Sequence, residues 1–208
     1  VINLVRKLGI TSDMPEMPSI ALGTADATVF QMVGAYGTFA NEGVYVKPVL
    51  VTRIEDKNGT VLFENTPETH DVVSAEVARA VVNLMEGVTR YGSGARLRTK
   101  GAETYNAIYK NVMTGYPYQF TNPIAGKTGT TQNNSDGWFI GMVPNLVTGV
   151  WVGGEDRAVH FRTTAYGQGT TMALPIFGYY MKKCYADKDL NVSKGAFPAP
   201  QNKEIPID

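Results

Sequence analysis

The sequence predicts an α+β fold in which an antiparallel sheet is flanked by helices. Three segments, residues 124–131, 137–143 and 146–153, have the pattern of β-strands. Short polar turns at residues 132–136 and 144–145 separate them, and connections this short favour an antiparallel meander. Because 43% of the 208 residues are hydrophobic, the chain can bury the core of one domain, or of most of one.

Two helices are predicted near the start of the chain. The first spans residues 1–8, where apolar residues recur at helical spacing, and it ends at Gly9. Thr28 and Gln31 form the capping-box pattern that opens a second helix, which ends near Asn41. The apolar face that we expect this helix to bury consists of Val29, Met32, Val33, Tyr36 and Phe39.

A β-hairpin and a third helix follow. Residues 49–64 contain two strand-like runs joined by Asn58-Gly59, a dipeptide that is typical of hairpin turns. Ser74 is the predicted N-cap of the third helix, which ends before Gly92. The residues expected on the buried face of this helix are Val77, Val81, Leu84, Met85 and Val88.

The rest of the chain contains one more helix between two irregular segments. Residues 91–122 have weak periodicity and predict a long connection that borders the functional cleft. A helix is predicted over residues 171–185, with Pro175 in its first turn and its apolar face on the sheet. Residues 187–208 lack periodicity, so we expect an extended or partly disordered tail after a domain that spans residues 1–186.

The composition excludes several classes of function. Nineteen basic residues balance nineteen acidic ones, so no net charge favours nucleic acid or an anionic membrane as a partner. Cys184 is the single cysteine and cannot form an internal disulfide, and with only His70 and His160 no cluster has the spacing of a metal site. No apolar run approaches the roughly 18 residues of a membrane-spanning segment.

The strongest chemical signal is a Lys-Thr-Gly triplet at residues 127–129. By itself, such a triplet is typical of a strand that enters a turn. A phosphate-binding loop would require glycine where Thr121 stands and a helix directly after Thr128. A polar run and a strand pattern follow instead, so the sequence argues against nucleotide binding, and no cofactor is expected.

Several other residues that invite a functional interpretation have simpler explanations. Aromatic residues that alternate on adjacent strands usually pack in a core, and this pattern is present at Trp138, Phe139 and Trp151. Asp136 is a candidate for either a turn or the cleft, and the turn is favoured because aspartate is common in turns. His160 fits a surface loop better than the position of a catalytic base.

In its context, the triplet resembles the Lys-Thr-Gly element of the penicillin-recognising serine acyltransferases. The segments that are similar to bifunctional, class A penicillin-binding proteins are residues 19–23, 35–43, 126–131, 136–141, 147–153 and 173–177. The resemblance therefore covers nearly all of residues 1–185. It implies a penicillin-binding-protein or serine β-lactamase-like fold from which the N-terminal part of the domain is missing.

The resemblance also implies roles for four residues. Lys127 and Thr130 are the expected catalytic residues. The Lys127 ammonium would attract the carboxylate of a D-Ala-D-Ala stem peptide or a β-lactam and assist proton transfer, while the Thr130 N–H would form half of an oxyanion hole. Thr128, Gly129 and Thr130 are the expected substrate-binding residues, because the threonines offer hydroxyl donors and Gly129 leaves room for the substrate backbone.

The nucleophile of that family is absent from this chain. It lies in a Ser-x-x-Lys motif, with a second motif Ser-x-Asn, and none of the six serines here has lysine three residues later or asparagine two residues later. Tyr109-Lys110-Asn111 matches a Tyr-x-Asn variant, but it directly precedes the Lys-Thr-Gly strand instead of lying well upstream. We therefore expect the C-terminal part of a transpeptidase domain, inactive by itself because acyl transfer needs an activated hydroxyl.

The expected function of the intact protein is peptidoglycan D,D-transpeptidation through an acyl-serine intermediate, in the cell envelope at the outer face of the cytoplasmic membrane. The expected partners are the stem peptide, β-lactams and the missing part of the same domain. Two alternatives remain open: a D,D-carboxypeptidase or β-lactamase-like relative, and a noncatalytic interaction module.

Overall fold

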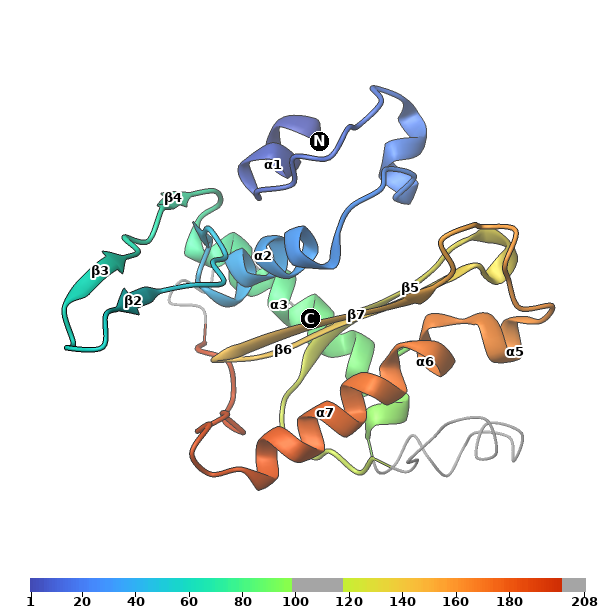
Figure 1. Ribbon diagram of the computed structural model, residues 1–208. Helices are drawn as coiled ribbons and strands as arrows, with labels where there is room; N and C mark the ends of the chain where they lie inside the picture. Colours follow the sequence, from blue (N-terminus) through green and yellow to red (C-terminus); the bar gives the residue numbers. More distant parts are fainter. Residues whose placement is uncertain (99–117, 200–208) are drawn as a thin grey trace.

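A three-stranded antiparallel sheet lies at the centre of the computed structural model, which describes residues 1–98 and 118–199 (Figure 1). Its strands are β5 (Ala125–Thr130), β6 (Asp136–Val143) and β7 (Leu146–Gly153), hydrogen-bonded in that order. The register pairs Thr130 with Gly137 and Val143 with Leu146, so each connection joins neighbouring strands. The antiparallel meander predicted from the short turns is confirmed.

Helices cover both faces of this sheet (Figure 1). On one face lie the short helices α5 (Thr164–Gly167) and α6 (Gly169–Met172) and the longer α7 (Leu174–Ala186). On the other lies α2 (Val29–Ala40), while α3 (Ala75–Arg90) packs against β5.

Glycines allow the helices to approach the strands closely. A side chain at Gly141 would overlap the ring of Phe177 in α7, and one at Gly149 would overlap Val33 in α2. Phe139 is fully buried on the α7 face, with its ring centroid 4.9 Å from that of Phe177. The main core cluster comprises Leu97, Tyr118, Phe120, Ile124, Phe139, Val143, Ala173, Leu174, Phe177 and Met181.

The bounds of the two N-terminal helices closely follow the sequence prediction, but the buried residues of α2 are Gly34, Ala35 and Thr38, while the predicted apolar face is only partly buried. Helix α1 (Ile2–Lys7) ends just before Gly9, and a 3₁₀ helix covers Pro18–Leu22. At the start of α2, Thr28 Oγ1 accepts a hydrogen bond from Gln31 N at 3.1 Å, and Gln31 Oε1 accepts one from Thr28 N at 3.1 Å. The predicted capping box is therefore confirmed, and it satisfies two N–H groups that the first helical turn leaves without partners.

Two small antiparallel sheets lie away from the centre. One pairs β1 (Val44–Val46) with β4 (Thr69–Asp71), and the other pairs β2 (Arg53–Glu55) with β3 (Val61–Glu64). The β2–β3 hairpin confirms the prediction, but its strands are shorter than residues 49–64 suggested. A register shift interrupts the pairing at β2, and the carboxylate of Asp56 accepts hydrogen bonds from backbone N–H groups in the turn.

Helix α3 begins after Ser74, whose hydroxyl accepts a hydrogen bond from Val77 N, and it ends before Gly92 as predicted. Its buried face includes Met85 as predicted but otherwise differs from the prediction. Val77 and Leu84 are 43% and 69% exposed. The residues that it buries are Ala78, Val82, Met85, Glu86 and Thr89. Thr89 favours this orientation of the helix, because its hydroxyl donates to the carbonyl of Ile124 outside α3, a partner that apolar periodicity does not register.

The last long helix begins at Leu174, three residues later than predicted. Pro175 lies in its first turn, as expected, but proline has no N–H to donate to the carbonyl of Thr171. The helical ladder is therefore interrupted at Ala173, and the preceding turn forms the separate helix α6.

The described part of the tail, residues 187–199, forms neither helix nor strand. It is nevertheless tied to the sheet, because the Asn145 side chain donates to the carbonyl of Asn191 and accepts from Ser193 N. Phe197 packs against the cluster that includes Val82. Across residues 1–98 and 118–199, no helix has the length and apolar character that a bilayer crossing requires.

Truncation of the Phe177 ring should destabilise the chain substantially. We expect Phe177→Ala to lower the free energy of unfolding by about 3–5 kcal/mol, because a fully buried aromatic residue leaves a cavity. Ile176→Ala is the matched control on the same helix, since Ile176 is 50% exposed and should cost about 1 kcal/mol or less. Urea unfolding of both variants tests this, and equal losses would contradict the assignment of Phe177 to the core.

Candidate functional site

The open edge of β5 carries the residues predicted to act in chemistry. β5 pairs with β6 on one side, and on its other side the described residues provide no strand. Lys127, Thr128, Gly129 and Thr130 all lie within β5. After Thr130 the chain passes through a three-residue 3₁₀ helix, Gln132–Asn134, and enters β6, so the α-helix that a phosphate loop would open does not follow this segment.

The register determines which backbone groups face the open edge. Thr131 N donates to Asp136 O at 3.1 Å, which makes these two residues a hydrogen-bonded pair. Such pairs alternate along an antiparallel ladder, so Gly129 and Lys127 direct their N–H and C=O groups at β6. Thr128 and Thr130 direct theirs away from β6, toward the open edge.

Lys127 is an exposed cation on this edge. Its Nζ donates to the carbonyl of Thr128 at 2.7 Å, one of the outward-facing groups. Within the part of the chain that the structure describes, no carboxylate lies within ion-pairing distance of this ammonium. The side chain is thus placed beside the edge with its charge available to an anion.

Both threonine hydroxyls are held by other segments of the chain. Thr128 Oγ1 lies 2.7 Å from Ser93 Oγ, and either atom can be the donor. Thr130 Oγ1 accepts a hydrogen bond from Gly169 N at the start of α6, at 3.0 Å. Since each hydroxyl can both donate and accept, the Thr130 hydrogen remains available to a ligand.

The close packing of β6 against β5 requires glycine at position 129. A Cβ atom at this position would lie 2.9 Å from Cβ of Trp138, its partner in the register. The sequence suggested that the missing side chain leaves room for substrate. The structure adds a second reason, which is that the space above Gly129 on this face is occupied by Trp138.

Asp136 organises the turn between β5 and β6. Its carboxylate is within hydrogen-bonding distance of the hydroxyls of Thr131 and Ser135, at 3.2 and 3.3 Å, and accepts from Trp151 Nε1 at 3.2 Å. Asp136 is only 7% exposed and is the first residue of β6. The sequence suggested an ordinary turn residue; the structure shows instead a buried acceptor that fixes the C-terminal end of β5.

The aromatic residues of β6 and β7 divide between the two faces of the sheet. Phe139 is buried, as predicted, but Trp151 is 40% exposed and its assignment to the core is wrong. Side chains alternate along a strand, so Trp138 and Trp151, which are partners in the register, lie on the face opposite to Phe139.

His160 is exposed and bonds the carbonyl of Phe161, which agrees with a surface position. Tyr109-Lys110-Asn111 lies outside the described residues.

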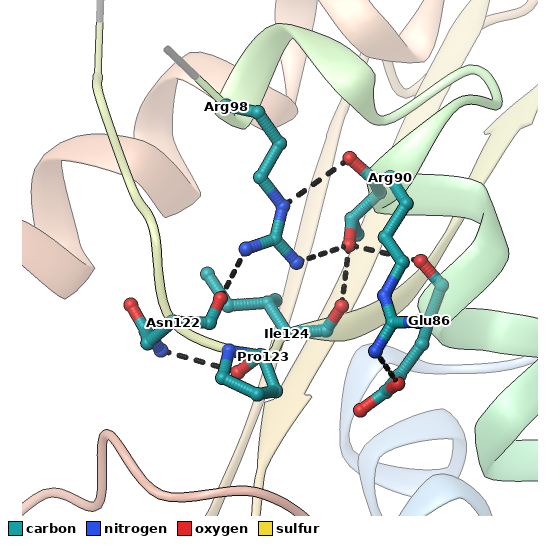
Figure 2. Close-up of polar contacts among 7 residues, drawn as sticks. Glu86, Arg90, Arg98, Asn122, Pro123 and Ile124 are labelled. Atoms are coloured by element: carbon teal, nitrogen blue, oxygen red, sulfur yellow. Dashed lines mark hydrogen bonds and ion pairs between the residues drawn. The ribbon is translucent and has the colours of Figure 1, made fainter. Parts of the chain in front are cut away.

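A polar network fixes the N-terminal end of β5 (Figure 2). Thr89 Oγ1 donates to the carbonyl of Ile124 at 2.5 Å, and Arg98 donates to Thr89 Oγ1 at 2.9 Å and to the carbonyl of Asn122. Burial lowers the pKa of the Arg98 guanidinium from its ordinary value, and the like charge of Arg90 adds to this effect. Sequence reasoning missed these residues, because neither Thr89 nor Arg98 belongs to a recognisable motif.

Arg90 completes this side of the network through an ion pair with Glu86, at 2.5 Å (Figure 2). Both residues line a cavity of about 350 Å³ between α2, α3 and the tail. The other charged residues at this cavity, Arg79 and Glu42, also pair with each other. The charged residues that line this cavity therefore form ion pairs with one another, whereas the ammonium of Lys127 has no carboxylate partner among the described residues.

Comparison with known proteins relates this chain to a family. Residues 16–173 match the family model described as the penicillin binding protein transpeptidase domain. The chain is 34% identical to penicillin-binding protein 1A of Aquifex aeolicus over 195 residues, covering 92% of this chain and 24% of that protein. It is 31% identical to penicillin-binding protein 2D of Bacillus subtilis over 153 residues, covering 74% of this chain and 20% of that protein. The chain thus spans about a quarter or less of the length of these relatives.

Solved structures show the same similarity. PonA1 from Mycobacterium tuberculosis, in complex with penicillin V, matches with a TM-score of 0.71 and 26% identity, covering 95% of this chain and 51% of that one. Penicillin-binding protein 1A from Haemophilus influenzae matches with a TM-score of 0.71 at 22% identity, covering 95% of this chain and 32% of that one. Because the identity to the Haemophilus influenzae protein is only 22%, that similarity shows the fold alone.

Removal of the Thr89 hydroxyl should weaken the support of β5. We expect Thr89→Val, which keeps the shape of the side chain, to lower the free energy of unfolding by about 1–3 kcal/mol, because buried partners at Ile124 and Arg98 lose a hydrogen bond. Thr60→Val in the exposed hairpin turn is the control and should change stability by about 0.5 kcal/mol or less. Urea unfolding of the two variants measures the difference, and a Thr89→Val chain as stable as the control would contradict this role.

Proposed function

Because this chain belongs to the penicillin-binding protein transpeptidase family, we propose that the open edge of β5 forms the carboxylate-binding wall of a D,D-transpeptidase active site. The substrate of the intact enzyme would be a peptidoglycan stem peptide, and β-lactams would bind in its place. The observation that carries the proposal is the position of Lys127. Its ammonium has no carboxylate partner among the described residues and lies on the strand edge that no other described strand covers.

The groups along this edge suit an extended peptide that ends in a carboxylate. The outward-facing N–H and C=O groups of Thr128 and Thr130 can pair with a substrate backbone as an added strand would. The Lys127 ammonium supplies the opposite charge for the carboxylate, and the Thr128 and Thr130 hydroxyls can each donate a hydrogen bond to it. A cation with two hydroxyl donors binds an anion more strongly than neutral donors alone.

The Thr130 N–H has a separate task in the proposed reaction. In the intact enzyme, a serine hydroxyl outside this chain would attack the carbonyl of the penultimate D-Ala. The carbonyl oxygen becomes an oxyanion, which the outward N–H of Thr130 can stabilise. Collapse of this intermediate breaks the peptide bond, releases the terminal D-Ala as its amine takes up a proton, and leaves an acyl-serine. The amine of a neighbouring stem then attacks this ester and regenerates the serine hydroxyl.

This function assigns further partners and a location to the intact protein. The serine and its lysine would come from another part of the same domain, because no serine here has lysine three residues later. That part would close the cleft over the β5 edge. Peptidoglycan is cross-linked outside the cytoplasmic membrane, so the site would operate in the cell envelope, on the outer face of that membrane.

Neutralisation of Lys127 should impair acylation. In the intact parent protein, we expect Lys127→Ala to slow labelling by a fluorescent penicillin by about 10- to 150-fold, the loss expected for one charge-assisted hydrogen bond. Lys57→Ala is the matched control, because Lys57 is an exposed lysine in the β2–β3 turn. Labelling rates follow from gel fluorescence against time. A Lys127→Ala rate equal to that of the control would remove Lys127 from the site.

The present chain by itself should not be acylated. Incubation with a β-lactam should leave its intact mass unchanged, because none of its six serines has the lysine that would activate it. Intact-protein mass spectrometry, with the parent protein as the positive control, measures this outcome. An adduct mapped by peptide sequencing to one of these serines would refute the assignment of the nucleophile to another part of the protein.

A further inference from the structure

The turn after α3 brings a third hydroxyl to the β5 edge. Residues 92–94 read Gly-Ser-Gly, and the chain then enters a 3₁₀ helix at Ala95–Leu97. Gly94 N donates to Val88 O at 2.9 Å, and a Cβ atom at Gly92 would lie 2.8 Å from Cα of Val88, so the turn packs closely on the end of α3. Gly94, Ala95 and the two residues after them are buried, whereas Ser93 is exposed.

Ser93 is held close to Thr128, although the two residues are 35 positions apart in the sequence. Their hydroxyl oxygens are 2.7 Å apart, and either can donate. A carboxylate can only accept hydrogen bonds, so a carboxylate bound by the Thr128 hydroxyl leaves that oxygen to accept from Ser93. The two hydroxyls then form a chain in which Ser93 donates to Thr128 and Thr128 donates to the anion. In such a chain, each hydrogen bond polarises and strengthens the next one.

The same turn is also anchored to α6. Arg96, which is 5% exposed, donates to Thr170 Oγ1 at 3.0 Å and to Thr171 Oγ1 at 3.4 Å. Thr170 follows Gly169, whose N–H donates to Thr130 Oγ1. The turn therefore contacts β5 directly at Thr128 and is linked through α6 to Thr130. The hydroxyls of both threonines are thus held by one connected set of hydrogen bonds.

We propose that Ser93 is a positioning residue for the carboxylate subsite: its O–H donates to Thr128 Oγ1 and thereby directs the Thr128 O–H at the substrate carboxylate. The inference rests on the proposed function, since it assumes that β5 binds the carboxylate. The Ser93 hydroxyl acts through Thr128 and does not enter the covalent chemistry. Its effect should therefore depend on the charge of the ligand.

The test compares a penicillin with its methyl ester in the intact parent protein. We expect Ser93→Ala to reduce the acylation efficiency with the penicillin carboxylate about tenfold, the loss of one hydrogen bond, mainly through weaker initial binding. With the methyl ester, whose carbonyl accepts only a neutral hydrogen bond, the loss should be smaller, about threefold or less. Ser93→Thr keeps the hydroxyl and should restore the efficiency to within about twofold of the wild type. Ser193→Ala, in the tail, is the control and should change neither rate.

A double-mutant cycle with Thr128→Val tests the route of the effect. If Ser93 acts through Thr128, Ser93→Ala should add no further loss once the Thr128 hydroxyl is gone. Thermal unfolding of each variant checks the fold, and Ser93→Cys, which retains only a weak donor, replaces Ser93→Ala if the alanine variant is unfolded at the assay temperature.

The outcomes separate the two proposals. Equal losses with the penicillin and its ester would show a structural role and overturn the inference, as would an unchanged rate with the penicillin or additive losses in the cycle. If the wild-type parent protein is not acylated at all, the proposed function fails and the inference with it. If the wild type is acylated and only the inference fails, the carboxylate is bound without help from Ser93.

Discussion

The antiparallel pairing of β5 with β6 is the constraint on which the candidate site depends. One register assigns the backbone groups of Lys127 and Gly129 to β6 and those of Thr128 and Thr130 to the open edge. If β5 were shifted by one residue relative to β6, the backbone groups of Thr128 and Thr130 would face β6 and those of Lys127 and Gly129 would face the open edge. The same shift would move each side chain of β5 to the other face of the sheet. The proposed site requires peptide N–H groups, hydroxyls and an ammonium to act together on one ligand, and this register places them along one edge.

An edge strand needs support, because its outer backbone groups have no ladder partners. In this chain the support comes from polar contacts at both ends. The buried carboxylate of Asp136 fixes the turn into β6, and Thr89 with Arg98 fixes the residues that lead into β5. Buried polar groups are costly without partners, so these networks favour one arrangement of the strand over alternatives.

Between the two ends, close packing holds the strand in place. Small residues let α7 approach one face of the sheet at Gly141 and let α2 approach the other at Gly149. Helices this close leave little room for the sheet to shift, since protein interiors are packed as densely as crystals of small molecules. The residues of the site can therefore stand on an edge open to ligand while the strand beneath them stays fixed. The chain spans about a quarter or less of the length of the curated relatives that it matches.

The features that could be predicted from the sequence are those that depend on residues close together along the chain. The capping box at Thr28, the helix cap at Ser74 and the strand character of residues 125–130 all follow from local hydrogen bonding and side-chain alternation. The orientation of α3 could not be predicted in this way, because the buried Thr89 hydroxyl has its partner at Ile124, 35 positions away, and apolar periodicity gives no signal for such a contact. Only the tertiary structure brought Ser93 to Thr128 across 35 positions, a contact produced by the path of the chain around β5, for which no local pattern gives a signal.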